Sequence, residues 1–212
     1  KAAASDSPAR ADRFAARLQQ SVAAPTALDY ATADGMFLRP TSLGDLFTQL
    51  ATHPDARLVA GATEIGVEIN KKFKKFPVLI STEAVPELTA IAKTTEGGWR
   101  IGAAVTLTAI EEKVAPEYPP LAKMLRVFAS RQIRNRATMG GNLATASPIG
   151  DCAPALLTLD ASLVLASAGG ERNLTLADFF TGYRKTALAA GEIIREIVLP
   201  PFAPAAGLTR RA

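Results

Sequence analysis

The feature that most constrains this chain is a short apolar segment that runs directly into a glycine, Leu58-Val59-Ala60-Gly61-Ala62-Thr63-Glu64-Ile65-Gly66. It predicts a strand, a tight connection at Gly61 and a helix that begins near Thr63. Such a helix points free N–H groups and its positive dipole end at an anion, and a glycine lets the backbone approach that anion closely. A plain strand–turn–helix connection is the alternative, since neither a Walker motif nor the Rossmann fingerprint is present.

A second glycine-containing segment runs from Thr138 to Pro148. Its adjacent glycines predict a loop with a nest of backbone amides. Short hydrogen-bonding side chains and apolar ones both occur in it, as a buried dinucleotide-binding loop requires. These residues are Thr138, Met139, Gly140, Gly141, Asn142, Leu143, Ala144, Thr145 and Ser147. The alternative is a glycine turn beside a solvated basic face formed by Arg131, Arg134 and Arg136, but two such segments in one chain favour a nucleotide site.

The remaining pattern predicts an α+β fold with two lobes. In the first half, Thr41 or Ser42 is expected to cap a helix, and strands are expected at 57–60 and 78–80, which indicates a small α/β lobe. In the second half, Gly97-Gly98 and Gly169-Gly170 each separate two strand-like runs, which predicts hairpins and a mainly antiparallel sheet. Thr106 is expected to cap a helix, a further helix is expected over 121–128, and a final strand is expected over 193–199.

The N-terminal part is expected to lie outside this ordered body. Residues 1–10 are expected to be a leader, and the spacing of Phe14, Leu18 and Val22 predicts a helix that ends at Pro25. Residues 25–35 are expected to be a linker, so the predicted domains are 1–35, leader and linker, and 36–212. The chain begins with Lys1 rather than Met, which suggests a fragment of a longer protein.

Composition excludes several classes of function. The 212 residues have a formal net charge of +4, 6% aromatic residues, one cysteine and one histidine. Without interleaved basic and aromatic residues, this charge argues against nucleic-acid binding. One cysteine, Cys152, cannot hold an iron–sulfur cluster or a structural zinc, and His53 next to Pro54 is typical of a loop histidine, so no hydrolytic triad is predicted.

Neither a membrane helix nor a signal peptide is predicted, because no apolar stretch is long enough and the Ala-rich start is broken by charges. A reducing, cytoplasmic location is expected. Asp151 either contacts a ribose or adenine-side group or caps a short helix. Cys152 is expected to be a packed small hydrophobe, and the Lys71–Lys75 run is expected to be a solvated face or, less simply, a docking surface.

Taken together, these motifs resemble the FAD-binding domain of the xanthine dehydrogenase type of molybdenum hydroxylase. The resemblance extends in order from about Met36 to Leu199. The runs that carry it are Leu58–Gly66, Arg131–Asn142, Ala146–Asp151 and Phe180-Thr181-Gly182-Tyr183-Arg184-Lys185-Thr186. The last two runs are more similar to xanthine dehydrogenases than to the carbon monoxide dehydrogenase branch.

The resemblance implies FAD in a cleft between the lobes. It implies that the segment Leu58, Val59, Ala60, Gly61, Ala62, Thr63, Glu64 and Ile65 wraps the pyrophosphate, and that Thr138, Met139, Gly140, Gly141 and Asn142 form the opposing wall. It also places Phe128 near the isoalloxazine ring, Asp151 in contact with FAD and Ile194 packed on the cofactor. Ala62 stands where relatives often have Asn, so a side-chain contact is lost there while backbone binding is retained.

The resemblance further implies an electron relay. Molybdopterin on a large subunit would oxidise hypoxanthine and xanthine to urate, two iron–sulfur clusters of the 2Fe–2S type would carry the electrons, and FAD would reduce NAD+. No acid–base residue is assigned in this chain. The iron–sulfur domain is expected before this segment, a further part of the FAD domain after it, and the assembly is expected to be a heterotetramer, a dimer of heterodimers.

Two alternatives remain open from the sequence. The chain could be the flavin subunit of another molybdenum hydroxylase that acts on a different heterocycle or an aldehyde. It could also be a non-catalytic assembly module that keeps the fold without flavin.

Overall fold

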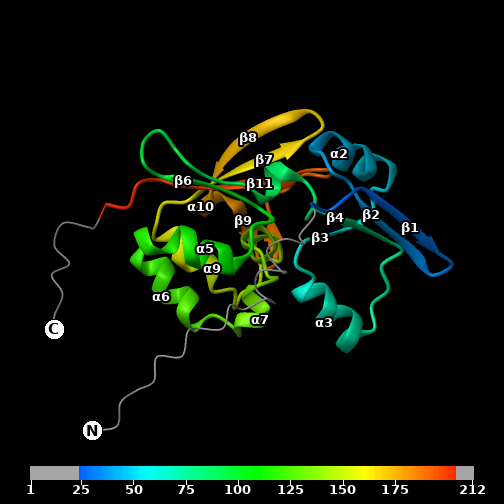
Figure 1. The fold of residues 1–212 in the computed structure, drawn as a ribbon, viewed down its shortest axis with the longest axis horizontal. Coiled ribbons are helices and arrows are strands. Elements are labelled where there is room, and N and C mark those ends of the chain that lie inside the picture. The colour runs from blue at the N-terminus through cyan, green and yellow to red at the C-terminus, as the bar shows by residue number, and fades with distance from the viewer. Residues whose placement is uncertain (1–23, 204–212) are drawn as a thin grey trace, which may run out of the picture.

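The computed structural model describes residues 24–203, which form two lobes that lie side by side (Figure 1). The strands of the first lobe are β1 (Leu28–Thr32), β2 (Gly35–Arg39), β3 (Arg57–Val59) and β4 (Val78–Ser81). Its helices are α2 (Leu43–Thr52) and α3 (Thr63–Lys72). The sheet order is β1-β2-β4-β3, with β2, β4 and β3 parallel and β1 antiparallel at the edge. The small α/β lobe predicted from the sequence is confirmed.

The second lobe is built on a five-stranded antiparallel sheet in the order β5-β6-β11-β7-β8. Its strands are β5 (Ile91–Lys93), β6 (Trp99–Gly102), β7 (Ser162–Ser167), β8 (Gly170–Thr175) and β11 (Ile193–Leu199). A two-stranded sheet is formed by β9 (Phe180–Gly182) and β10 (Lys185–Thr186). Both predicted glycine hairpins are present, and the mainly antiparallel second lobe is confirmed.

Short helices cover this sheet, and Figure 1 shows α5, α6 and α9 gathered on one side of it. The helices are α4 (Pro86–Thr89), α5 (Leu107–Lys113), α6 (Pro119–Val127), α7 (Arg131–Arg134), α8 (Met139–Ala144), α9 (Cys152–Leu157) and α10 (Leu176–Phe179), with a 3-10 turn η1 (Ala115–Glu117). The predicted caps at Ser42 and Thr106 are confirmed, because each hydroxyl accepts from an N–H in the first helical turn. Such a bond satisfies one of the N–H groups that a helix start leaves unpaired.

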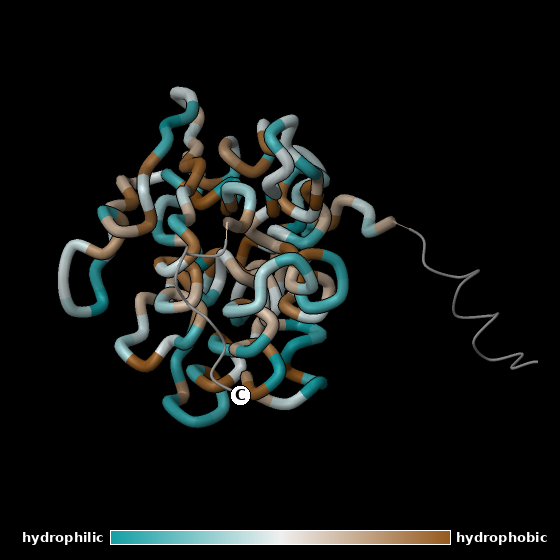
Figure 2. The backbone as a smooth tube through the Cα atoms, turned by 90° about the vertical axis from the view of Figure 1, so that its left-hand side faces the viewer, coloured by the Kyte–Doolittle hydropathy of each residue, from teal (hydrophilic) through white to brown (hydrophobic). Residues whose placement is uncertain are grey.

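Two clusters of buried residues hold the lobes together. The larger cluster lies within the second lobe, under its sheet. The smaller cluster joins Leu38 and Ile80 of the first lobe to Ala166 and Ile193 of the second. Figure 2 shows the hydrophobic stretches mostly inside and hydrophilic loops around them. Because interiors are close-packed, this shared cluster fixes the relative position of the two lobes, and therefore the width of the space between them.

The expected linker over 25–35 is wrong from Leu28 onward, because β1 begins at Leu28 and pairs with β2 from Leu28↔Arg39 to Thr32↔Gly35. All five residues of β1 are exposed, so the strand has no alternation of buried and exposed side chains that a sequence pattern could reveal. The predicted leader and helix around Phe14, Leu18 and Val22 lie outside the described residues.

Candidate functional site

A cavity of about 640 Å³ opens between the lobes. Its volume lies in the range of small-molecule and cofactor sites. Thirteen of the residues predicted to bind a cofactor line it: Leu58, Ala60, Gly61, Ala62, Thr63, Glu64, Ile65, Phe128, Thr138, Gly140, Gly141, Asn142 and Ile194. The fold therefore brings together positions that are as much as 136 residues apart, from Leu58 to Ile194 (194 − 58).

Three predicted residues do not line the cavity. Val59 is buried within β3, and Met139 is fully buried in the large hydrophobic cluster. Asp151 is exposed and occupies the N-cap position of α9 without a side-chain hydrogen bond to the helix. Any role of Val59 or Met139 in binding is therefore exerted through the backbone or through packing.

The first lobe contributes the start of helix α3, with a row of backbone N–H groups, to the cavity wall. Helix α3 begins at Thr63 as predicted, directly after Ala62, which adopts a left-handed conformation with φ 60°. No side chain caps this helix, and within residues 24–203 no hydrogen bond uses the backbone N–H groups of Gly61 to Ile65. Consecutive N–H groups at the start of a ten-residue helix that line a cavity are suited to bind an anion.

Gly61 is required for packing against the backbone that leads into the second glycine segment. A Cβ atom at this position would lie 1.7 Å from the carbonyl oxygen of Arg136 and 3.0 Å from the backbone nitrogen of Ala137. The backbone of the first glycine segment therefore lies directly against the backbone that leads into the second. No side chain larger than a hydrogen fits between them.

The second glycine segment differs from its prediction, because it forms helix α8 rather than an amide nest. Thr138 caps this helix, its Oγ1 accepting from the N–H of Gly141 at 3.1 Å. The N–H groups of Met139 and Gly140 donate to the carbonyl oxygens of Val105 at 3.3 Å and Ala103 at 3.0 Å. The N–H of Asn142 donates to the carbonyl oxygen of Thr138. These amides are already satisfied, so this wall offers side chains and glycine surface instead of free N–H groups.

Apolar groups line the remainder of the cavity. Phe128 packs partly against the large cluster, and Ile194 is buried in β11, so both present hydrophobic surface to the cavity. Sequence reasoning missed further lining residues: Leu50, Ala103, Ala104, Ile133, Ile149, Leu188 and Ile193. Ile133 and Ile149 lie within the motif runs but were not assigned to the site. The other five occur in no local motif, and only the packing of the two lobes brings them to the cavity.

The charged residues among the described lining positions are Arg57, Glu64 and Glu192. Arg172 donates to both carboxylate oxygens of Glu192, at 2.7 and 2.8 Å. The Arg172 guanidinium lowers the pKa of Glu192, although burial opposes it. Glu192 also accepts from the N–H of Ala189 at 2.9 Å, so this carboxylate organises the loop before β11 and remains ionised.

Other predicted features are placed as follows. Cys152 is buried, and burial raises the pKa of its thiol to about 12, which confirms a packed, unreactive residue. His53 ends α2 through its backbone N–H. Residues 71–75 are exposed, as expected for a solvated face, and Lys74 pairs with Glu68. Residues 24–203 contain no helix long and apolar enough to span a membrane, and no cluster of three potential metal ligands.

Comparison with known proteins agrees with this geometry. The family model for the FAD binding domain in molybdopterin dehydrogenase matches residues 30–202. Xanthine dehydrogenase/oxidase of Gallus gallus is 38% identical over 177 residues, which are 78% of this chain but 13% of that protein. The chain thus spans a small part of that relative.

Two solved structures resemble this chain in overall fold. Quinoline 2-oxidoreductase from Pseudomonas putida 86 has a TM-score of 0.75 and 31% identity, covering 82% of this chain and 61% of that chain. Carbon monoxide dehydrogenase from Hydrogenophaga pseudoflava has a TM-score of 0.75 and 28% identity, with the same coverage of 82% and 61%. This chain belongs to the family of FAD-binding domains of molybdopterin dehydrogenases.

Proposed function

We propose that this chain is the flavin-carrying part of a xanthine dehydrogenase, which relays electrons to NAD+ while a molybdopterin centre elsewhere oxidises hypoxanthine and xanthine to urate. The observation that carries the binding part of this proposal is the row of free amides from Gly61 to Ile65 at the edge of the cavity. A pyrophosphate is the part of FAD that such a row would bind.

The residues present fit FAD in three respects. The start of α3 provides N–H donors for the pyrophosphate, and the cavity of about 640 Å³ has the size of a cofactor site. Phe128 and Ile194 provide apolar surface for a flat ring system. Thr138 and Asn142 line the same cavity and add polar side chains at the opposite wall.

When bound, FAD supplies the redox chemistry, accepting electrons from iron–sulfur clusters and passing a hydride to NAD+. This chain's own residues would bind FAD, orient it and shield it from water. The Arg172 guanidinium keeps the Glu192 carboxylate ionised. Glu192 is therefore suited to hold the loop before β11 and not to exchange a proton. We therefore assign no acid–base step to this domain.

The choice of xanthine dehydrogenase rests on sequence. The 38% identity to the Gallus gallus protein extends over most of this chain, and the identity to the quinoline and carbon monoxide enzymes is lower, at 31% and 28%. By the same reasoning we propose a molybdopterin-binding large subunit and a domain with two iron–sulfur clusters as partners. We also propose a heterotetrameric assembly and a cytoplasmic location.

The test uses the full chain purified with its partner subunits. We expect flavin absorbance, release of one FAD per chain on denaturation, and NAD+ reduction with hypoxanthine and xanthine. A complex that reduces NAD+ with quinoline-like heterocycles or aldehydes but never with these purines would replace the proposed substrate by the alternative molybdenum hydroxylase. A colourless protein that releases no FAD would instead identify a non-catalytic assembly module.

A further inference from the structure

The turn between α6 and α7 forms part of the cavity wall and is conformationally unfavourable. Phe128 and Ala129 both line the cavity. Ala129 has a φ of 44°, in the left-handed region, where its Cβ lies close to a neighbouring carbonyl oxygen. A non-glycine residue keeps this conformation only when its surroundings hold it.

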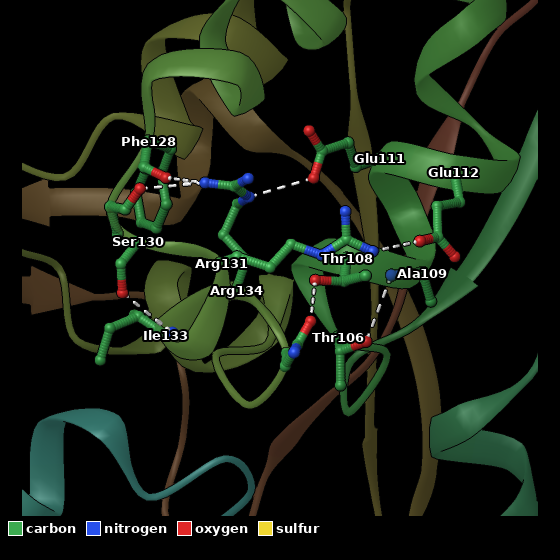
Figure 3. Close-up of polar contacts among 12 residues, drawn as sticks. Thr106, Thr108, Ala109, Glu111, Glu112, Phe128, Ser130, Arg131, Ile133 and Arg134 are labelled. Atoms are coloured by element: carbon green, nitrogen blue, oxygen red, sulfur yellow. Dashed lines mark hydrogen bonds and ion pairs between the residues drawn. The ribbon is translucent and has the colours of Figure 1, made fainter. Parts of the chain in front are cut away.

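One side chain outside the cavity holds this turn. The Arg134 Nη1 donates to the carbonyl oxygen of Phe128 at 2.7 Å and to that of Ala129 at 2.9 Å, and its Nε donates to Glu111 Oε2 at 3.0 Å (Figure 3). The Arg134 side chain is only 11% exposed. A single guanidinium therefore connects α7, the end of α6 and Glu111 of α5.

The neighbouring arginine provides a contrast. Arg131 pairs with Glu112 at 2.7 Å, and both side chains are more than half exposed. Among the described residues, Arg131 makes no side-chain hydrogen bond to the turn. Arg131 is therefore a solvated residue and Arg134 a structural one, although the sequence shows them as equivalent.

The chemistry favours arginine over lysine at position 134. A guanidinium is planar and donates in several fixed directions, so it can serve two carbonyl oxygens and a carboxylate at once. An ammonium group is a point charge on a flexible stem and cannot reproduce this geometry. The carbonyl oxygens concerned lie directly after the last turn of α6, where a cation also interacts favourably with the helix dipole.

We propose that Arg134 is a positioning residue for the cofactor cleft. By holding the carbonyl oxygens of Phe128 and Ala129, it fixes the left-handed turn and therefore where the Phe128 ring stands in the cavity wall. Arg134 acts through Phe128 and does not line the cavity itself. This inference rests on the proposed function, because it assumes that the cavity binds FAD.

The test compares R134Q and R134K with the matched control R131Q, each in the full chain purified with its partner subunits. FAD affinity is measured by titrating deflavinated protein and following flavin fluorescence, and visible circular dichroism reports the environment of the bound flavin. We expect R134Q to weaken FAD binding about tenfold, and R131Q to leave it within about twofold of the unsubstituted protein. Both Arg134 variants should alter the flavin dichroism.

A double-mutant cycle separates positioning from general destabilisation. If Arg134 acts through Phe128, then R134Q should cause no further loss of FAD affinity in protein that already carries F128A. Additive losses would overturn the inference, as would unchanged FAD affinity and dichroism in the Arg134 variants. If R134Q does not fold, R134K decides, and flavin dichroism identical to that of the unsubstituted protein would contradict the proposal.

Failure of the proposed function gives a different result. In that case the unsubstituted protein itself binds no FAD, whereas failure of the inference alone leaves an unsubstituted protein that binds FAD.

Discussion

The two glycine segments look alike in sequence and differ in structure. From Gly61 to Ile65 the backbone N–H groups make no hydrogen bond within residues 24–203, because the segment leads into α3 without a side-chain cap. From Met139 to Asn142 they are bonded, because Thr138 and the carbonyl oxygens of Ala103 and Val105 already accept them. Glycine allows close backbone packing in both, but only the first segment retains the capacity to bind an anion. The availability of the amides, rather than the presence of glycine, distinguishes the binding wall.

The largest expected effect comes from Gly61→Ala. The new Cβ would meet the carbonyl oxygen of Arg136, 1.7 Å away, and neither backbone can move without separating the two segments. We expect the free energy of unfolding to fall by about 3 kcal/mol or more, measured by urea denaturation, together with loss of bound FAD.

The matched control is Gly66→Ala, also in the first segment but inside α3. A Cβ there has no neighbour within 4 Å, so alanine should stabilise the helix by about 0.5–1 kcal/mol. Equal stability of the two variants would show that the contact between the segments does not matter.

Thr138→Ala makes the second segment resemble the first. It removes the hydroxyl that accepts from the N–H of Gly141, and we expect a loss of about 1–2 kcal/mol of unfolding free energy in urea denaturation. Thr138→Ser keeps the acceptor and should restore most of this stability. If serine and alanine are equally destabilising, the hydroxyl cap does not stabilise helix α8.

Ala62→Gly should remove an unfavourable backbone conformation from the first glycine segment. Ala62 has a φ of 60°, which glycine adopts freely, so we expect a gain of about 0.5–1 kcal/mol in thermal or urea unfolding. Ala51→Gly, inside the regular helix α2, should instead lose a similar amount. A loss at both positions would contradict the strain assigned to Ala62.

The smallest effect concerns the loop before β11, which the Glu192 carboxylate holds through Arg172 and the N–H of Ala189. Arg172 lowers the pKa of Glu192 below its ordinary value of 4.5, so the pair stabilises the fold above this pH and the stabilisation is lost as pH falls through the lowered pKa. Because Arg172 is 45% exposed, solvent screening weakens this pair, and we expect its effect on stability at pH 7 to be the smallest of the series.

The measurement is urea unfolding of Glu192→Gln and unsubstituted protein from pH 7 to pH 3. The difference between them should shrink toward acid, because protonation of Glu192 removes its ion pair with Arg172. A difference that grows toward acid would have the wrong sign for this pair.

Sequence patterns predicted the features that depend only on residues close together in the chain. The caps at Ser42 and Thr106, the start of α3 and the two hairpins follow from local turn and cap chemistry, and all are present. Helix α8 was predicted as a loop because two glycines disfavour a helix, yet the Thr138 cap and the tight contact of Gly140 with Ala103 stabilise it.

The cavity could be predicted only in part. The two glycine segments that line it were predicted from their motifs. Ala103, Ala104 and the residues from Leu188 to Ile193 reach the cavity only through the packing of the lobes. The roles of the arginines were equally hidden, because the burial of Arg134 depends on α5 and on the end of α6. Such contacts join distant parts of the chain and leave no local pattern.

The central claim is that FAD binds to the free amides at the start of α3 and not to the amides of α8. Hydrogen–deuterium exchange of deflavinated and FAD-loaded protein tests it directly, using peptides that cover residues 58–66 and 138–145. We predict that FAD slows exchange strongly at Gly61–Ile65 and changes it little at Met139–Asn142, where exchange is already slow. Slowing confined to Met139–Asn142, with Gly61–Ile65 unchanged, would contradict the account.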